Sequence, residues 1–203
     1  GDGGGPGKNV QVLRPGDSIQ AAINRSRDGG YVYLRPGTYR EFSDPVNGLN
    51  ISKSIHLIGL SFPGRGNGVT DRPRRAVIQN SGGQRNGIVV VPDDRQNCMS
   101  CHSDLAPPFP IKPGVEPGLK MREPMIHKVE IRGITIDGFD NNGLFTENVD
   151  GFSLVDVTSL NNRNYGIFPT LSKNGVITRS EAFGSDLDSG IWVETSENVD
   201  VTY

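Results

Sequence analysis

The strongest constraint on the fold is an internal repeat in the last third of the chain. Three segments begin at Gly143, Gly166 and Gly190, so the spacings are 23 and 24 residues. A unit of this length holds about three short strands with tight turns. It is too short for a strand followed by a crossover helix, which needs about 30 residues or more. Because one unit cannot bury its apolar face alone but stacked units can, the repeat predicts an all-β parallel β-helix.

Equivalent positions of the three segments carry similar side chains. An aliphatic and then an aromatic residue follow the glycine, a second aliphatic residue stands eleven positions after it, and Asn or Asp stands two positions before it. Asn and Asp suit hydrogen-bonded turns, and like residues in successive units predict ladders of side chains. The columns are Leu144, Ile167 and Ile191; Phe145, Phe168 and Trp192; Leu154, Ile177 and Val201; and Asn141, Asn164 and Asp188.

The pattern Asn-x-Gly-Ile followed by Asn-Val-x-Val resembles the right-handed parallel β-helix repeat of the pectin-lyase-like superfamily. The opening LRPGDSIQAAINRSRDGGYVYLRPGTYRE is similar to the usual start of that superfamily. The resemblance covers the chain from about Val10 to Tyr203 and implies a right-handed parallel β-helix. For function it implies several classes, because this fold carries lyases, hydrolases, epimerases, sugar-binding proteins and metal-handling proteins, copper-delivery proteins among them.

Length and composition favour one domain. The chain has 203 residues, of which 34% are apolar, with 27 glycines and 14 prolines, as suits a turn-rich solenoid with a thin core. We interpret residues 1–9 as a flexible leader and residues 10–203 as the β-helix domain. The net charge of −2, without a long basic run, argues against nucleic acid or an anionic membrane surface as a partner. No apolar run is long enough for a transmembrane span.

The two ends of the chain suggest a location and a partner. The leader begins without Met and resembles the tether of bacterial lipoproteins, which predicts an extracytoplasmic protein that is periplasmic, secreted or lipid-tethered at the cell surface. Tyr203 stops in the middle of a predicted unit. This predicts an exposed β-edge, which a longer solenoid or another chain packed end-on would cover.

The first half of the chain predicts one helix among short strands. Asp17 is the expected N-cap, with Gln20 completing a capping box. Ile19 and Ile23 then share one helical face, Gly29-Gly30 is the expected stop, and the helix should plug the bottom of the solenoid. Strands are expected at Val10 to Leu13, Tyr31 to Leu34, Ile51 to Leu60, Ala76 to Gln79, Gly87 to Val91 and Val129 to Ile136.

An insertion at residues 92–124 interrupts the repeat. It holds seven of the 14 prolines, and structureless loops longer than about 12–15 residues are often functional. It also holds both cysteines, in the motif Cys98-Met99-Ser100-Cys101-His102. This Cys-x-x-Cys-His motif resembles the attachment motif of c-type cytochromes. The resemblance implies thioether bonds from Cys98 and Cys101 to one haem c, with His102 as the proximal iron ligand.

Met121, Met125 or His127 would supply the sixth haem ligand, because Met or His is the usual partner. This interpretation predicts an electron-transfer role with a redox partner protein. Two alternatives remain open. The cysteines could form a disulfide clip, because extracytoplasmic thiols oxidise. Cys98 and Cys101 could instead be half of a zinc site, with two more ligands from His102, His127, Asp93, Asp94 or Asp104. For a divalent metal in general, the candidate ligands are His102, Met125 and His127. His56, within an expected strand, is interpreted as a structural residue.

A second function class, polysaccharide binding or cleavage, rests on carboxylates. Glu147, Thr170 and Glu194 stand four residues after their glycines and should share a face. Glu147 and Glu194 would then be roughly 9.6 Å apart, at about 4.8 Å per strand, which is at the edge of the range for an inverting glycosidase pair. Asp186 and Asp188 lie on the turn before Gly190 and could bind calcium.

Trp192 and Phe168 could stack a sugar ring in such a site. The aromatic column could equally be a structural stack, and the Asn/Asp column could serve only as turn residues. Residues 65–75 contain four arginines and are either a solvated loop or a clamp for an anion such as a uronate. The sequence therefore leaves open whether the chain is an enzyme, a redox protein or a structural or metal-delivery scaffold.

Overall fold

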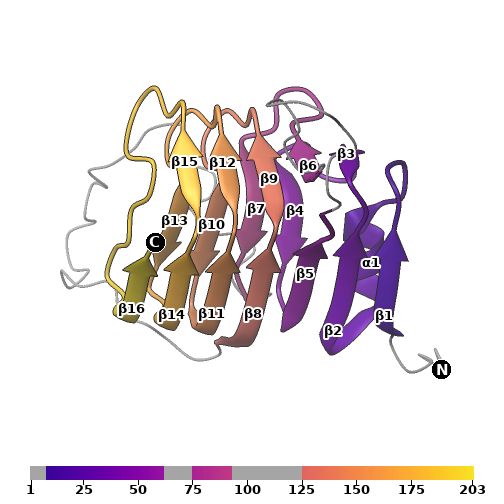
Figure 1. Cartoon of the computed structure of the whole chain (residues 1–203), viewed down its shortest axis with the longest axis horizontal. Helices are drawn as coiled ribbons and strands as arrows, with labels where there is room; N and C mark the ends of the chain where they lie inside the picture. The colour runs from indigo at the N-terminus through magenta and orange to yellow at the C-terminus, as the bar shows by residue number, and fades with distance from the viewer. Residues whose placement is uncertain (1–7, 62–74, 93–124) are drawn as a thin grey trace, which may run out of the picture.

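The computed structural model describes residues 8–61, 75–92 and 125–203, which form sixteen strands and one helix (Figure 1). The strands make three parallel sheets. The seven-stranded sheet contains β1 (Lys8–Leu13), β2 (Ser26–Leu34), β5 (Ile55–Gly59), β8 (Ile126–Arg132), β11 (Val149–Val155), β14 (Lys173–Thr178) and β16 (Glu197–Thr202). The five-stranded sheet contains β3 (Gly37–Tyr39), β6 (Ala76–Gln79), β9 (Ile134–Asp137), β12 (Thr158–Leu160) and β15 (Glu181–Phe183). The four-stranded sheet contains β4 (Asn47–Ile51), β7 (Asn86–Val90), β10 (Leu144–Glu147) and β13 (Ile167–Thr170).

Consecutive strands go to the three sheets in turn. From β2 to β15, the chain passes from the seven-stranded to the five-stranded to the four-stranded sheet and then back to the first. Each strand from β2 to β12 therefore pairs in parallel with the strand three places later. Figure 1 shows the seven-stranded sheet running along the long axis, with β16 at one end and β1 at the other. The expected all-β class with parallel strands is confirmed.

The repeat columns found in the sequence are columns of paired residues. Leu144 pairs with Ile167, and Ile167 pairs with Ile191 through an isolated bridge. In the seven-stranded sheet, Leu154 pairs with Ile177. These ladders form the core, in which nearly every aliphatic side chain is fully buried. Each buried aliphatic side chain contributes roughly 1.5–3 kcal/mol to stability, so the interior between the sheets is the main source of stability.

The glycines that open each repeat unit stand where two backbones approach closely. A methyl group added at Gly87 would lie 2.4 Å from the carbonyl oxygen of Gly143, and one at Gly143 would lie 2.5 Å from that of Gly166. The same relation holds between Gly48 and Gly87, at 2.7 Å. Any larger residue would therefore push neighbouring units apart, which explains why glycine recurs at this position.

Asparagine side chains stabilise the corner at which the chain enters the four-stranded sheet. The side chain of Asn86 donates to that of Asn47 at 2.9 Å and accepts from that of Asn141 at 3.2 Å. These side chains are buried, and a buried polar group is costly unless it is hydrogen-bonded. This ladder thus supplies hydrogen-bond partners to the buried asparagine side chains at the corner. The turn role expected for the Asn column is confirmed at Asn141.

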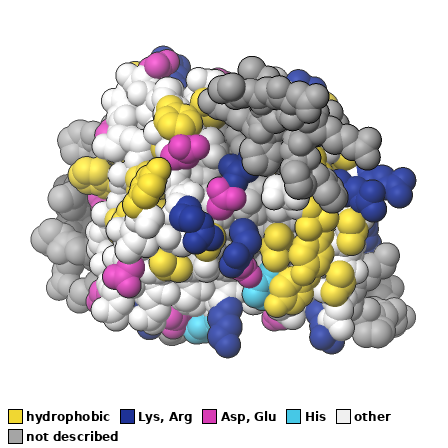
Figure 2. All heavy atoms as spheres, in the orientation of Figure 1, with side chains coloured by type: hydrophobic (Ala, Val, Ile, Leu, Met, Phe, Trp, Pro, Cys, Tyr) yellow, Lys and Arg dark blue, Asp and Glu magenta, His cyan; other side chains and the backbone are white. Residues whose placement is uncertain are grey.

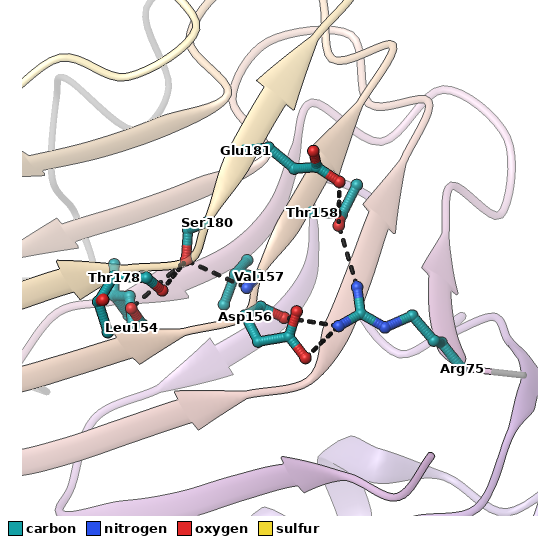
Figure 3. Close-up of polar contacts among 8 residues, drawn as sticks. All are labelled: Arg75, Leu154, Asp156, Val157, Thr158, Thr178, Ser180 and Glu181. Carbon is teal, nitrogen blue, oxygen red and sulfur yellow. Dashed lines mark hydrogen bonds and ion pairs between the residues drawn. The ribbon is translucent and has the colours of Figure 1, made fainter. Parts of the chain in front are cut away.

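A second corner, between the seven-stranded and five-stranded sheets, is shown in Figure 3. The hydroxyl of Ser180 donates to the carbonyl of Thr178 at 3.0 Å and accepts from the backbone N–H of Val157 at 3.1 Å. Arg75 donates to Thr158 Oγ1 at 3.1 Å and forms an ion pair with the carboxylate of Asp156. The guanidinium of Arg75 therefore makes a structural contact with β12 and the corner before it, and the anion clamp remains a prediction. The rest of the arginine-rich segment lies outside the described residues.

The helix lies where it was expected, but its ends differ. Helix α1 (Ile19–Arg25) begins after the N-cap Ser18, whose side chain accepts from the N–H of Ala21 at 3.1 Å. The prediction of Asp17 as N-cap was wrong, because its carboxylate accepts from the N–H of Arg14 instead, at 2.8 Å. The prediction that Gly29-Gly30 ends the helix was also wrong. Those residues lie inside β2, and Ser26 is the C-cap.

Glu41 supplies the helix contact that sequence patterns did not reveal. Its carboxylate accepts from the backbone N–H of Ile19 at 2.5 Å and from the hydroxyl of Ser18 at 2.9 Å. A carboxylate is stabilising at a helix N-terminus, where N–H groups are free and the helix dipole is positive. The buried face of α1, with Ile19, Ala22 and Ile23, packs into the core at one end of the sheets (Figure 1).

Two of the stretches that were each expected to form one strand contain parts of two strands. The stretch 51–60 contains the end of β4 and all of β5, which belong to different sheets. The stretch 129–136 contains parts of β8 and β9, separated by Gly133 at φ +67°. The corners are short, at residues 52–54 and at Gly133, so each stretch is no longer than one ordinary strand and was read as one. Among the described residues, no helix is long and apolar enough to cross a membrane.

Candidate functional site

An aromatic column runs across the outer face of the four-stranded sheet. Phe145 pairs with Phe168 in the register of β10 and β13, and their ring centroids are 5.4 Å apart. Because successive strand side chains point to opposite faces and Leu144 and Ile167 belong to the core, these rings point outward. Exposure rises along the column, from 1% for Phe145 to 45% for Trp192. The open end of the column therefore offers aromatic surface to a ligand.

Tyr165 joins this column from the turn before Gly166. Its ring centroid is 4.5 Å from that of Phe168 and 6.4 Å from that of Trp192. The three rings form one partly exposed surface. Sequence analysis missed Tyr165, because the equivalent positions of the neighbouring units hold Asn142 and Ser189 and show no aromatic column.

Two of the expected carboxylates act on the hydroxyl of Tyr165. Burial first, then a hydrogen bond to Asp188 and the negative charges of Asp188 and Glu194, raises the pKa of Tyr165 to about 12. An ionised phenolate would have no proton to share with Asp188 and would face two like charges. The turn before Gly190 and the bridged segment after it thus place Asp188 and Glu194 near one tyrosine.

The predicted pair Glu147 and Glu194 shares a backbone column. Thr170 pairs with Glu147 in the β10–β13 ladder and with Glu194 through an isolated bridge. Two strand spacings therefore separate the two glutamates along the sheet. Glu147 is 8% exposed, whereas Glu194 is half-buried. Their role as a catalytic pair remains a prediction.

The acidic turn itself lies at the surface. Asp186 and Asp188 are both exposed, and Asp188 accepts from the N–H of Ser189 at 2.7 Å. In the part of the chain that the structure describes, no three His, Cys, Asp or Glu side chains are grouped so as to hold a metal ion. The described residues therefore do not provide a set of ligands for the calcium ion that was suggested at this turn.

One buried acceptor lies beside Tyr165 in the chain. Asn164 is 8% exposed, and its side-chain oxygen has no hydrogen-bond partner. Its backbone is fixed, because its N–H donates to the carbonyl of Asn141 at 2.8 Å. A buried acceptor without a donor is costly. This oxygen is enclosed, so it belongs to the interior of the turn rather than to the exposed aromatic surface.

The haem and metal predictions fall mostly outside the described residues. Cys98, Cys101, His102 and Met121 lie in the undescribed range 93–124. Met125, just before β8, is 8% exposed. His127 is well exposed, and its Nδ1 lies 3.6 Å from a carboxylate oxygen of Asp150. Haem or metal ligation by Met125 and His127 therefore remains a prediction.

A second aromatic surface covers the outer face of β1, β2 and β5 and forms the hydrophobic patch near one end of the molecule in Figure 2. Val10, Tyr31 and His56 pair in one row, and the rings of Tyr31 and His56 stack at 4.1 Å. His56 Nδ1 lies 2.8 Å from Glu130 Oε2. Burial alone would raise the pKa of Glu130, but hydrogen bonds to His56 and Arg132 and their charges outweigh it and lower that pKa. These contacts agree with the structural role expected for His56.

Comparisons with known proteins give no relative. The chain matches no protein-family model, and no curated protein and no solved structure matches it significantly.

Proposed function

We propose that this chain is a right-handed parallel β-helix protein that binds a polysaccharide on the outer face of its four-stranded sheet. The observation that carries the proposal is the cluster of Tyr165, Phe168 and Trp192, partly exposed and flanked by the carboxylates of Asp188 and Glu194. The rotation of the chain through three parallel sheets supports the β-helix, as does the sequence resemblance to the pectin-lyase-like superfamily.

The residue types of the cluster suit a sugar. Aromatic rings offer a flat apolar face with a polar tip, and a pyranose ring has apolar C–H faces that stack on such a ring. Carboxylates accept hydrogen bonds and form the stronger, charge-assisted kind, so Asp188 and Glu194 would orient the sugar hydroxyls. A few fixed polar groups beside an apolar surface are the usual composition of a ligand site.

Affinity electrophoresis in gels that contain soluble polysaccharides tests binding. We expect at least one neutral, acidic or amino-bearing polysaccharide to retard the chain. Trp192→Ala and Tyr165→Ala should abolish the retardation, because each removes stacking area. Phe42→Ala is the matched control, since Phe42 is 77% exposed and belongs to neither aromatic surface. Retardation that persists in both site variants would refute the site.

Cleavage is a further step that the same proteins can test. Glu147 and Glu194 would act as an acid and base pair if the bound glycan is hydrolysed. Release of reducing ends by the wild-type chain, lost in Glu194→Gln while binding persists, would establish an enzyme. Binding without release from any retarding polysaccharide would establish a binding protein.

A redox role is the second candidate, because the sequence contains Cys98-Met99-Ser100-Cys101-His102. We propose that a host with haem-maturation machinery would attach one haem c there, outside the cytoplasm, with Met121, Met125 or His127 as sixth ligand. The reduced protein should then show a sharp α-band, and its mass should exceed the chain mass by one haem. A colourless protein that is two protons lighter than the dithiol would instead establish the disulfide clip.

A further inference from the structure

The charges of the aromatic–carboxylate site, defined as Tyr165, Phe168, Trp192, Asp188 and Glu194, narrow the class of glycan that it can take. Resting on the polysaccharide-binding function proposed above, we infer that this site selects a glycan with free, protonated amino groups, such as a glucosamine polymer, over neutral or uronic-acid glycans.

The first step is the balance of charge around the aromatic rings. Residues 161–168 and 184–194, which carry the site, hold three carboxylates, Asp186, Asp188 and Glu194, against one cation, Arg163. Asp186 and Asp188 are exposed, so their charges face solvent. A uronate would bring a like charge to this surface, and like charges repel, whereas an ammonium group would be attracted.

The second step is the balance of donors and acceptors. The carboxylates of Asp186 and Asp188 are exposed and can only accept hydrogen bonds. With Glu194, they form a surface of acceptors beside the aromatic rings. An ammonium group has three donors and no acceptor, so it complements this surface better than a hydroxyl or an acetamide does.

The third step is the aromatic geometry. Trp192 is 45% exposed, and its centroid lies 6.4 Å from that of Tyr165. A cation within about 6 Å of the face of such a ring is attracted by its quadrupole, and tryptophan is the best partner for it. The same rings that stack on the sugar would therefore also attract the amino group at its C2 position.

Calorimetric titration with three tetrasaccharides tests the inference. The probes are the β-1,4-linked tetramer of glucosamine, its fully N-acetylated form and tetragalacturonate, at low salt and at a pH where the amine is protonated. We expect the amine tetramer to bind about tenfold or more tightly than the acetylated one, as one charge-assisted hydrogen bond would give. Tetragalacturonate should bind most weakly. Added salt should reduce the preference, because it screens exposed charges.

Variants separate the contribution of the carboxylates to binding from that of the aromatic surface. Asp188→Asn and Glu194→Gln should bring the two glucosamine-based tetramers to nearly equal affinity, while Trp192→Ala should remove binding of both. Asp200→Asn is the matched charge control, because Asp200 is exposed on β16 and outside the site. Circular dichroism confirms that each variant is folded.

The outcomes distinguish this inference from the function on which it rests. Equal binding of the amine and acetylated tetramers, or tighter binding of tetragalacturonate, overturns the amine preference and leaves polysaccharide binding intact. A preference for the amine that survives in both Asp188→Asn and Glu194→Gln overturns the assignment to these carboxylates. If none of the tetramers binds and no polysaccharide retards the chain, both proposals fail together.

Discussion

Single residues set how closely the repeat units stack, and glycine is the clearest case. A methyl group at Gly166 would lie 2.5 Å from both Ala182 Cβ and the carbonyl oxygen of Gly190. At Gly190, in the same column, the nearest atom would be 3.2 Å away. The two positions look equivalent in sequence, but only the structure shows that the first is the more crowded.

Gly166→Ala should therefore lower the free energy of unfolding by about 1–3 kcal/mol, the usual cost of overpacking. Gly190→Ala is the matched control and should cost less, since a shift of a few tenths of an ångström makes room for its methyl group. Urea denaturation of both variants gives the comparison. Equal stability of Gly166→Ala and wild type would mean that the backbones are not held at this distance.

The tyrosine hydroxyls give a prediction in pH. Tyr39 and Tyr165 both have a pKa raised to about 12, mainly by burial. A folded-state pKa above the ordinary value of about 10 adds stability that is fully present below pH 10 and is lost as pH rises toward 12. In an absorbance titration of phenolate, Tyr165→Phe should remove one of the two late steps, and Asp188→Asn should move one step to lower pH. An unchanged titration in Asp188→Asn would show that Asp188 does not contact Tyr165.

At the scale of elements, the helix shows what local sequence could and could not reveal. The amphipathic pattern of Ile19, Ala22 and Ile23 was enough to predict α1 and its buried face. The N-terminal contacts were not predictable, because Glu41 reaches the helix from more than twenty positions away in the chain. No periodic pattern reports a contact of that kind.

Removing that contact should destabilise the chain measurably. Glu41→Ala leaves the N–H of Ile19 without its acceptor, and we expect a loss of about 1–2 kcal/mol, as for other capping side chains. Asp17→Ala, the residue that sequence alone favoured, should cost less because its hydrogen bond to Arg14 is exposed. Chemical denaturation ranks the two variants. A larger loss for Asp17→Ala would restore the original assignment.

The same limit applies to the candidate site. Its columns could be read from the sequence where the repeat is uninterrupted, so Phe168, Trp192 and Glu194 were found. The register of Phe145 with Phe168 and of Thr170 with Glu194 was correct. Tyr165 was not found, because it belongs to no repeat column. Only the conformation of the turn before Gly166 brings its ring to those of Phe168 and Trp192. Gly48 and Gly87 belong to the glycine column as well, but loops of unequal length separate them from Gly143 and hide the period.

At the scale of the whole molecule, the seven-stranded sheet ends at β16. Among the described residues, β16 has one hydrogen-bonded neighbour in its sheet, β14. Val201 continues the core ladder of Leu154 and Ile177 but is 54% exposed. An apolar parallel edge is a template for another strand, which a second chain packed end-on would supply.

The 203-residue chain should therefore self-associate through this edge. Val199→Glu with Val201→Glu should weaken the association, because charge on an edge strand opposes pairing. Phe42→Glu adds a charge at another exposed apolar residue and should have no effect. Sedimentation velocity over a range of concentrations measures all three proteins. A wild-type monomer at every concentration would count against end-on packing.

Trp192 allows a direct test of the central proposal, because it is the only tryptophan in the chain and lies at the open end of the aromatic surface. Its emission can be followed during titration with a polysaccharide that retards the chain, with acrylamide quenching measured before and after. Stacking of a sugar on the 45% exposed ring should shift the emission to shorter wavelength, saturably, and should protect the ring from quenching. Binding that leaves both the emission and the quenching of Trp192 unchanged would place the glycan elsewhere and contradict the proposed site.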